Sequence, residues 1–147
     1  MVWGCFSASG VGYLHFLPPN STMRKGNYRL MLNKVLLDEL QRANCNIFMH
    51  DKAPAHTAAA VSEWLSKNQI KVLPWPGNSP DLNPIENLWK LIKDRVAAKK
   101  SQSLASLTIN IQAVWNEFPV NYCVNLVSSI PKRIAGIIAN NGYHCKY

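Results

Sequence analysis

Acidic residues are scarce in this chain of 147 residues. It has 8 Asp and Glu against 16 Lys and Arg, which gives a formal net charge of +8 and a pI near 9.5. A basic domain of this size often binds a polyanion, so the charge points to nucleic acid as a partner. The alternative is a basic surface without a partner, and charge alone does not separate the two.

Long apolar runs and a secretory signal are also missing. No apolar stretch reaches the roughly 18 residues of a membrane span, and the segment after Met1 lacks the basic start of a signal peptide. Glycine and proline are not in excess, and no repeat occurs at solenoid periods. Because 48% of the residues are apolar, the sequence predicts one intracellular domain with a buried core.

Clustered cysteines are absent. The four cysteines are far apart, no Cys-x-x-Cys pair occurs, and the four histidines do not complete a zinc-binding spacing. Cys45 begins an apolar run and Cys123 lies among apolar residues, which predicts buried free thiols in a reducing compartment.

Short β-rich runs alternate with helical patterns along the chain. A hairpin is expected from strands at 2–7 and 12–17, followed by strands at 45–49 and 70–73. Helical spacing predicts helices at about 27–43, 57–68, 84–98, 104–118 and 131–139. A strand, helix, strand alternation predicts a parallel pair joined by a right-handed crossover, and hence an α/β domain with a mixed sheet.

Two carboxylates stand where chemistry is often found. Asp51 follows an apolar run, which puts it at the C-terminal end of a buried strand, where open α/β sheets hold their sites. Glu86 lies on the first turn of the helix after a proline-rich loop. Each has a structural alternative: Asp51 as a strand-end turn residue, and Glu86 in a capping box with Asn83 and an ion pair with Lys90.

Two long motifs contain these carboxylates. Residues 50–58, HDKAPAHTA, resemble the second-aspartate motif of the mariner superfamily of DNA transposases, and residues 73–89, LPWPGNSPDLNPIENLW, resemble its third-carboxylate motif. The 34 residues between Asp51 and Glu86 (52 to 85) match the nematode-type branch, which has a terminal glutamate. The resemblance covers essentially the whole chain, with Val2-Trp3-Gly4-Cys5 similar to the family's Trp-Gly strand and Pro131-Lys132-Arg133 and residues 142–147 similar to its C-terminus.

The resemblance implies a ribonuclease H-like fold, in which helices flank a mixed sheet and three carboxylates bind two Mg²⁺ or Mn²⁺ ions. Two hard cations about 4 Å apart take oxygen ligands and hold the attacking and leaving oxygens of a phosphoryl transfer. By this resemblance, Asp51 and Glu86 are catalytic and metal-binding residues. The implied activity is metal-dependent DNA strand cleavage and strand transfer in the nucleus. Transposon ends and target DNA are the implied partners, with a homodimer allowed and neither a membrane nor a small-molecule substrate.

The 147 residues also depart from the family. The family's first catalytic aspartate lies on a strand before the Trp-Gly hairpin, and a helix-turn-helix module precedes that strand. This sequence contains neither. Residues 1–147 are therefore expected to form one partial catalytic domain that lacks its first, central strand and is inactive alone. The alternatives are a non-catalytic module for DNA binding or dimerisation, and the product of a dead element.

Basic residues and one histidine complete the expected site. Lys52 stands where the family more often has Asn, and its ammonium competes with a metal for Asp51 unless it points to solvent. His56 is expected either to form a local hydrogen bond or to contact DNA phosphate. Further phosphate contacts, or else solvated helix faces, are expected at Lys90, Lys93, Lys132 and Arg133.

Overall fold

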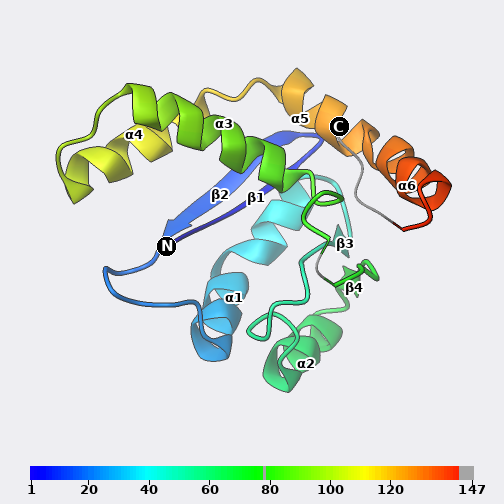
Figure 1. Cartoon of the computed structure of the whole chain (residues 1–147). Helices are drawn as coiled ribbons and strands as arrows, with labels where there is room; N and C mark the ends of the chain where they lie inside the picture. The colour runs from blue at the N-terminus through cyan, green and yellow to red at the C-terminus, as the bar shows by residue number, and fades with distance from the viewer. Residues whose placement is uncertain (78, 143–147) are drawn as a thin grey trace. The chain divides into compact units, whose positions relative to one another are not determined.

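The computed structural model describes residues 1–77 and 79–142 (Figure 1). Six helices and four strands occur in this part of the chain. Their order is β1 (Val2–Ser7), β2 (Gly10–Phe16), α1 (Lys25–Arg42), β3 (Ile47–Phe48), α2 (Ala59–Lys67), β4 (Lys71–Val72), α3 (Ile85–Ala98), α4 (Leu104–Asn116), α5 (Val120–Ser128) and α6 (Ile130–Ala139).

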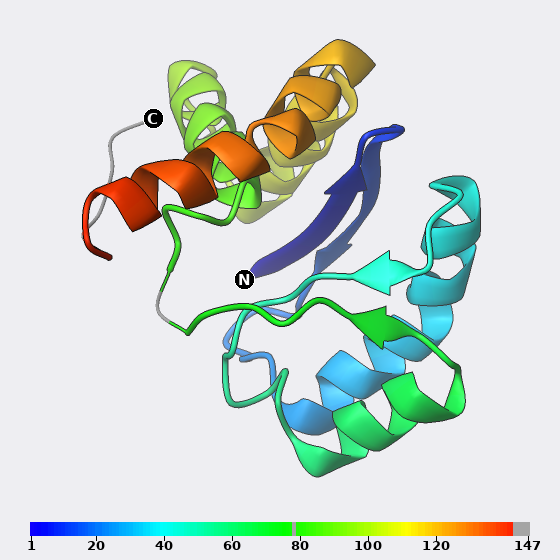
Figure 2. The same cartoon turned by 90° about the vertical axis from the view of Figure 1, so that its right-hand side faces the viewer.

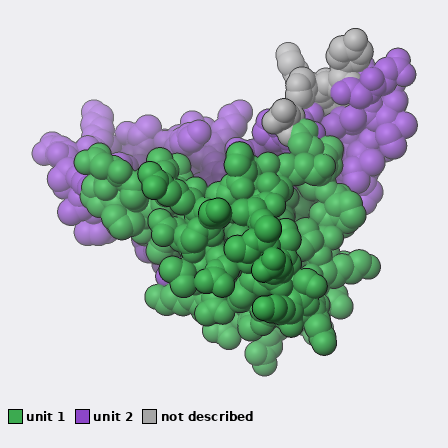
Figure 3. Space-filling model, turned by 90° about the horizontal axis from the view of Figure 1, so that it is seen from below, with its two compact units in different colours: residues 1–3, 15–78 green, residues 4–14, 79–147 purple. Residues whose placement is uncertain are grey.

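The chain divides into two compact units, which Figure 3 colours separately. Unit 1 comprises Met1–Trp3 and His15–Asn78, and unit 2 comprises Gly4–Leu14 and Ser79–Tyr147. The β1–β2 hairpin therefore gives residues to both units. No helix in the described residues is long and apolar enough to cross a bilayer.

Unit 1 is built on a parallel strand pair. β3 pairs with β4 in the register Ile47–Lys71 and Phe48–Val72, and Figure 2 shows the two arrows side by side in the same direction. The chain between the strands contains α2, as a parallel pair requires a crossover connection. The predicted strand–helix–strand unit is confirmed.

Helix α1 buries one apolar face in unit 1. Its buried residues recur at helical spacing, which is why this stretch forms an amphipathic helix against α2. Tyr28 and Leu32 are completely buried, as is Val61 on α2. The Trp64 indole donates a hydrogen bond of 3.0 Å to the Asn33 side chain, which also ties α2 to α1.

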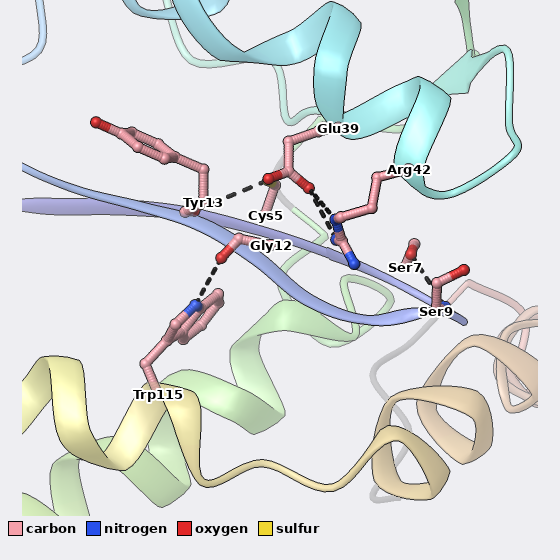
Figure 4. A network of polar contacts seen from close by, with 8 residues as sticks. All are labelled: Cys5, Ser7, Ser9, Gly12, Tyr13, Glu39, Arg42 and Trp115. Atoms are coloured by element: carbon pink, nitrogen blue, oxygen red, sulfur yellow. Dashed lines mark hydrogen bonds and ion pairs between the residues drawn. The ribbon is translucent and has the colours of Figure 1, made fainter.

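Unit 2 packs α3 against α4 and against the hairpin residues it contains. α3 buries a stripe at i, i+4 and i+8. Trp115 of α4 is 1% exposed, stacks on Trp89 at 5.4 Å between ring centroids, and donates a 2.8 Å hydrogen bond to the Gly12 carbonyl (Figure 4). A Cβ on Gly4 would lie 3.0 Å from Trp115 and 3.1 Å from Trp89, so glycine lets the strand approach these rings.

Several predicted elements differ from the structure. The described residues form two separate two-stranded sheets, β1–β2 and β3–β4, instead of one mixed sheet. The helix α5 was not predicted, because Pro119 signalled a break, yet Pro119 is its N-cap residue. Cys123 is buried as predicted, but Cys45 is exposed. Asn44, at a φ of 48°, turns the chain after α1, so Cys45 precedes β3. Cys145 and the motif at 143–147 lie outside the described residues.

The expected capping box at α3 is wrong in detail. The helix begins at Ile85 with Pro84 as its N-cap, and no side chain of that residue caps it. The Asn83 side-chain oxygen accepts a 3.3 Å hydrogen bond from the Ile85 amide, and the Asn83 carbonyl accepts from the Glu86 amide at 3.1 Å. The Glu86 carboxylate is thus not used in a reciprocal cap.

Candidate functional site

Asp51 lies in irregular backbone shortly after β3, in unit 1. Its Oδ1 accepts hydrogen bonds from the Ala53 amide at 2.9 Å and from His56 Nδ1 at 2.5 Å. A carboxylate only accepts hydrogen bonds when ionised, so His56 Nδ1 carries the proton. The Asp51 side chain is 56% exposed, and Oδ2 accepts no hydrogen bond from the described residues. One oxygen is held and the other is available to a ligand.

A stack of three rings supports this carboxylate. The Tyr28 and His56 rings lie 4.0 Å apart between centroids at 28°, and the His50 and His56 rings lie 5.5 Å apart at 11°. Tyr28 Oη is hydrogen-bonded to His50 Nδ1 at 3.1 Å. The stack therefore connects the buried face of α1 to the segment that carries Asp51.

The environment keeps His50 neutral. Burial, reinforced by the neighbouring His56, lowers the pKa of His50 from 6.5 to about 4, although Asp51 opposes the shift. At neutral pH the ring next to Asp51 therefore carries no charge.

A cavity of about 420 Å³ opens beside Asp51 within unit 1. Lys52, His56 and Thr57 line it together with Asp51, and the buried residues Leu65 and Trp75 form apolar parts of its wall. Trp75 is only 7% exposed and belongs to this wall.

Lys52 is exposed at the same place. Its aliphatic chain passes close to Gly77, where an added Cβ would lie 3.6 Å from Lys52 Cδ. No ion pair joins Lys52 to Asp51 among the described residues. No salt bridge among the described residues therefore supports the expected competition of the Lys52 ammonium with a metal ion for Asp51.

Glu86 is held differently, in unit 2. It is exposed, on the first turn of α3, the helix end where a negative charge is favourable. Asp51 and Glu86 belong to different units, and each unit is described by itself. The expectation that the two carboxylates face one site stays a prediction.

The predicted phosphate contacts divide into two groups. Lys52, Lys90, Lys93 and Lys132 are exposed, as phosphate contacts must be. Arg133 is 5% exposed.

The guanidinium of Arg133 is engaged inside unit 2. It donates to the Ser129 hydroxyl at 2.8 Å, the Asp81 carbonyl at 2.9 Å and the Asn87 side-chain oxygen at 2.7 Å. Arg133 therefore holds α6 to the start of α3, which makes it the weakest of the predicted phosphate contacts.

Tyr28 was not singled out by the sequence. It follows Asn27 at the start of a helical pattern and looks like an ordinary core position there. Its contacts with His50 and His56 join residues at least 22 positions apart, and no local motif records such a contact.

The family model described as "DDE superfamily endonuclease" matches residues 12–108, which include Asp51 and Glu86. The chain belongs to this family. The Tcb1 transposase of Caenorhabditis briggsae is 32% identical over 150 residues, and the Tc1 transposase of Caenorhabditis elegans is 31% identical over 149. Each match covers 100% of this chain and 54% of the relative, so the chain spans about half the length of these relatives. The domain is thus that of the Tc1/mariner transposases.

The solved catalytic domain of the Mos1 mariner transposase has the same α/β fold. It is 26% identical, with a TM-score of 0.89, and the match covers 99% of this chain and 75% of that one. Mos1 itself comes from Drosophila mauritiana. Other structures of the Mos1 domain contain raltegravir with Mn or Mg, and Mos1 also forms a paired-end complex with the left transposon end.

The donor chemistry of the two carboxylates suits Mg²⁺ or Mn²⁺. Both ions prefer oxygen ligands, and Asp51 keeps an exposed oxygen for one. No cluster of three or more His, Cys, Asp or Glu side chains able to hold a metal occurs among the described residues. Each carboxylate thus has the donor type that these ions prefer, and the metal-binding role of Asp51 and Glu86 stays a prediction.

Proposed function

We propose that residues 1–147 form part of the catalytic domain of a cut-and-paste DNA transposase that cleaves DNA strands and joins them to a target. The observation that carries the proposal is Asp51, held by one oxygen with the other exposed, inside the segment that matches the family. We propose Glu86 as its partner ligand. The sites on the DNA are the transposon ends and the target, and the protein works in the nucleus.

The roles of the residues follow from their chemistry. Asp51 and Glu86 bind and orient divalent cations, Mg²⁺ or Mn²⁺, through carboxylate oxygens. Such a metal pair supplies activation of the attacking oxygen and stabilisation of the leaving oxygen in phosphoryl transfer. Lys52, Lys90, Lys93 and Lys132 neutralise DNA phosphates and set the position of the strand without reading its sequence.

We also propose that these 147 residues alone do not cut DNA. By the resemblance to the family, they contain two of the three carboxylates of the family's site, Asp51 and Glu86. A missing ligand loosens the alignment of the reacting groups, and misplacement by about 1 Å already reduces rates by about 100-fold.

A nicking assay on supercoiled DNA tests this proposal. With Mg²⁺ or Mn²⁺, the 147-residue chain and its Asp51→Ala variant should both leave the DNA supercoiled. Metal-dependent nicking by the chain that disappears in Asp51→Ala would contradict the proposal, because a third ligand would then come from another group.

A second function is favoured by the net charge of +8 and the exposed lysines. The same residues can serve as a non-catalytic DNA-binding module. Fluorescence anisotropy in increasing Mn²⁺ separates the two: an enzyme fragment should change its DNA affinity with Mn²⁺ in a way that Asp51→Asn abolishes. A simple binding module should respond identically in both proteins.

A further inference from the structure

Regular secondary structure does not hold the Asp51 side chain in position. Asp51 lies outside any helix or strand, and its side chain is 56% exposed. The Ala53 amide is a local donor two residues away, which sets the turn around Asp51. The other donor to Oδ1, His56 Nδ1, is therefore the contact that connects the carboxylate to the rest of unit 1.

His56 is in turn held by α1. Its side chain is only 16% exposed and its ring stacks on Tyr28 at 4.0 Å. Tyr28 is completely buried, so this ring cannot shift without disturbing the core of unit 1. The hydrogen bond between Tyr28 Oη and His50 Nδ1 holds His50, the residue just before Asp51. Tyr28 on α1 therefore contacts the segment around Asp51 in two ways, through the ring of His56 and through the side chain of His50.

We propose that His56 is a positioning residue for Asp51 and that Tyr28 holds His56 in place. The proposal rests on the metal-binding role proposed for Asp51. The hydrogen bond from His56 fixes the carboxylate so that Oδ2 faces the ligand, as partners of metal-binding side chains commonly do. Because Nδ1 is committed to Asp51, direct contact with a DNA phosphate is left to Nε2 and is not the main role of His56.

Core packing alone gives a different expectation. If the ring of His56 only fills space on Tyr28, then phenylalanine should replace it without effect on Asp51. If the Nδ1–H donor matters, asparagine should replace it better, since its side-chain amide reaches the position of Nδ1. The two substitutions therefore distinguish the contribution of the His56 ring from that of its Nδ1–H donor.

The experiment uses Mn²⁺ as a paramagnetic probe in NMR spectra of the 147-residue chain. Bound Mn²⁺ broadens the Ala53 amide signal, and the Mn²⁺ concentration for half-broadening reports affinity at Asp51 even when binding is weak. We expect His56→Phe to raise that concentration by about 10-fold, the lower end for loss of such a supporting bond. His56→Asn should restore most of the affinity, which a ligand role for Nε2 does not predict. Tyr28→Phe keeps the ring that stacks on His56 and loses only the hydrogen bond to His50, so it should raise the concentration less than His56→Phe does.

Thermal unfolding of each variant accompanies the titration. Weaker Mn²⁺ binding by His56→Phe with an unchanged melting temperature supports positioning. Wild-type Mn²⁺ binding by His56→Phe overturns the positioning role and leaves the metal role of Asp51 intact. Absence of broadening in the wild-type chain, or equal broadening in Asp51→Asn, overturns the metal role itself and this proposal with it.

Discussion

The two carboxylates are supported in different ways in their two units. Asp51 lies in irregular backbone and depends on side chains from elsewhere in unit 1, namely His56 and through it Tyr28. Glu86 lies on the first turn of α3, where the helix backbone fixes its Cα and the side chain is exposed. Glu86 is therefore positioned by the helix, whereas Asp51 is positioned by the rings of His56 and Tyr28.

This difference predicts which substitutions displace each carboxylate. Substitutions on α1, which is distant from Asp51 in the sequence, should displace Asp51 because Tyr28 on α1 stacks on His56. Glu86 should respond to changes that move the start of α3 as a whole. Arg133 is the residue in unit 2 that fixes this start, because it bonds both the Asp81 carbonyl and the side chain of Asn87, the neighbour of Glu86.

The largest effect is expected from Arg133→Met, with Lys132→Met as its matched control. The first change removes three part-buried hydrogen bonds of a charged donor, so the free energy of unfolding should fall by about 2–3 kcal/mol. The exposed Lys132 should change it by less than about 0.5 kcal/mol. Urea unfolding measures both. Equal stability of the two variants would show that Arg133 does not hold α3.

The same pair separates folding from DNA binding. Lys132→Met should reduce the slope of log affinity against log salt by about 0.9, the amount for one lost phosphate contact. Arg133→Met should leave this slope unchanged under conditions where the variant stays folded. Fluorescence anisotropy over a salt series gives the slopes. A loss of slope in Arg133→Met alone would reverse our assignment of the two residues.

Two glycines allow the next comparison. Gly4→Ala places a Cβ 3.0 Å from Trp115 and 3.1 Å from Leu14, so overpacking should destabilise unit 2 by about 1–3 kcal/mol. Gly26→Ala, on α1 of unit 1, meets nothing within 4 Å and should stabilise the chain by up to about 1 kcal/mol. Thermal unfolding of both variants gives the signs. A stabilising Gly4→Ala would mean that the Trp89 and Trp115 rings readily move apart.

The smallest expected effect is the loss of folding stability at acidic pH that His50 causes. The folded pKa of His50, about 4, lies below its ordinary value of 6.5, so the unfolded chain binds the proton first as the pH falls. The contribution of His50 to stability is therefore complete above pH 6.5 and is lost between 6.5 and about 4. Urea unfolding at pH 7.5 and pH 5 should show a larger loss in the wild type than in His50→Gln. NMR titration showing an ordinary His50 pKa would contradict this account.

The sequence predicted the elements better than their contacts. Helical periodicity located α1, α2, α3, α4 and α6 to within a few residues. The buried stripe is clearest in α1 and α3, whose buried residues recur at helical spacing. The helix α5 was missed where Pro119 looked like a break. The predicted mixed sheet appears as two strand pairs, since β3 and β4 pair over only two residues each.

The candidate site was partly predictable for a similar reason. Asp51, Lys52 and His56 belong to one contiguous motif, so the sequence alone placed them together. The sequence did not predict the role of Tyr28, because that role depends on a tertiary contact with the motif. Arg133 was taken for a surface cation because nothing in Pro131-Lys132-Arg133 shows which side chain turns inward.

We propose that Asp51 and Glu86 bind the same metal ions, and iron-directed cleavage tests this proposal most directly. Fe²⁺ in place of Mg²⁺, with ascorbate and peroxide, generates radicals that cut the backbone near the bound ion. We expect cuts close to both residue 51 and residue 86, and loss of both sets in Asp51→Asn and in Glu86→Gln. Cuts near only one of the two residues, or cuts near 86 that persist in Asp51→Asn, would contradict a shared site.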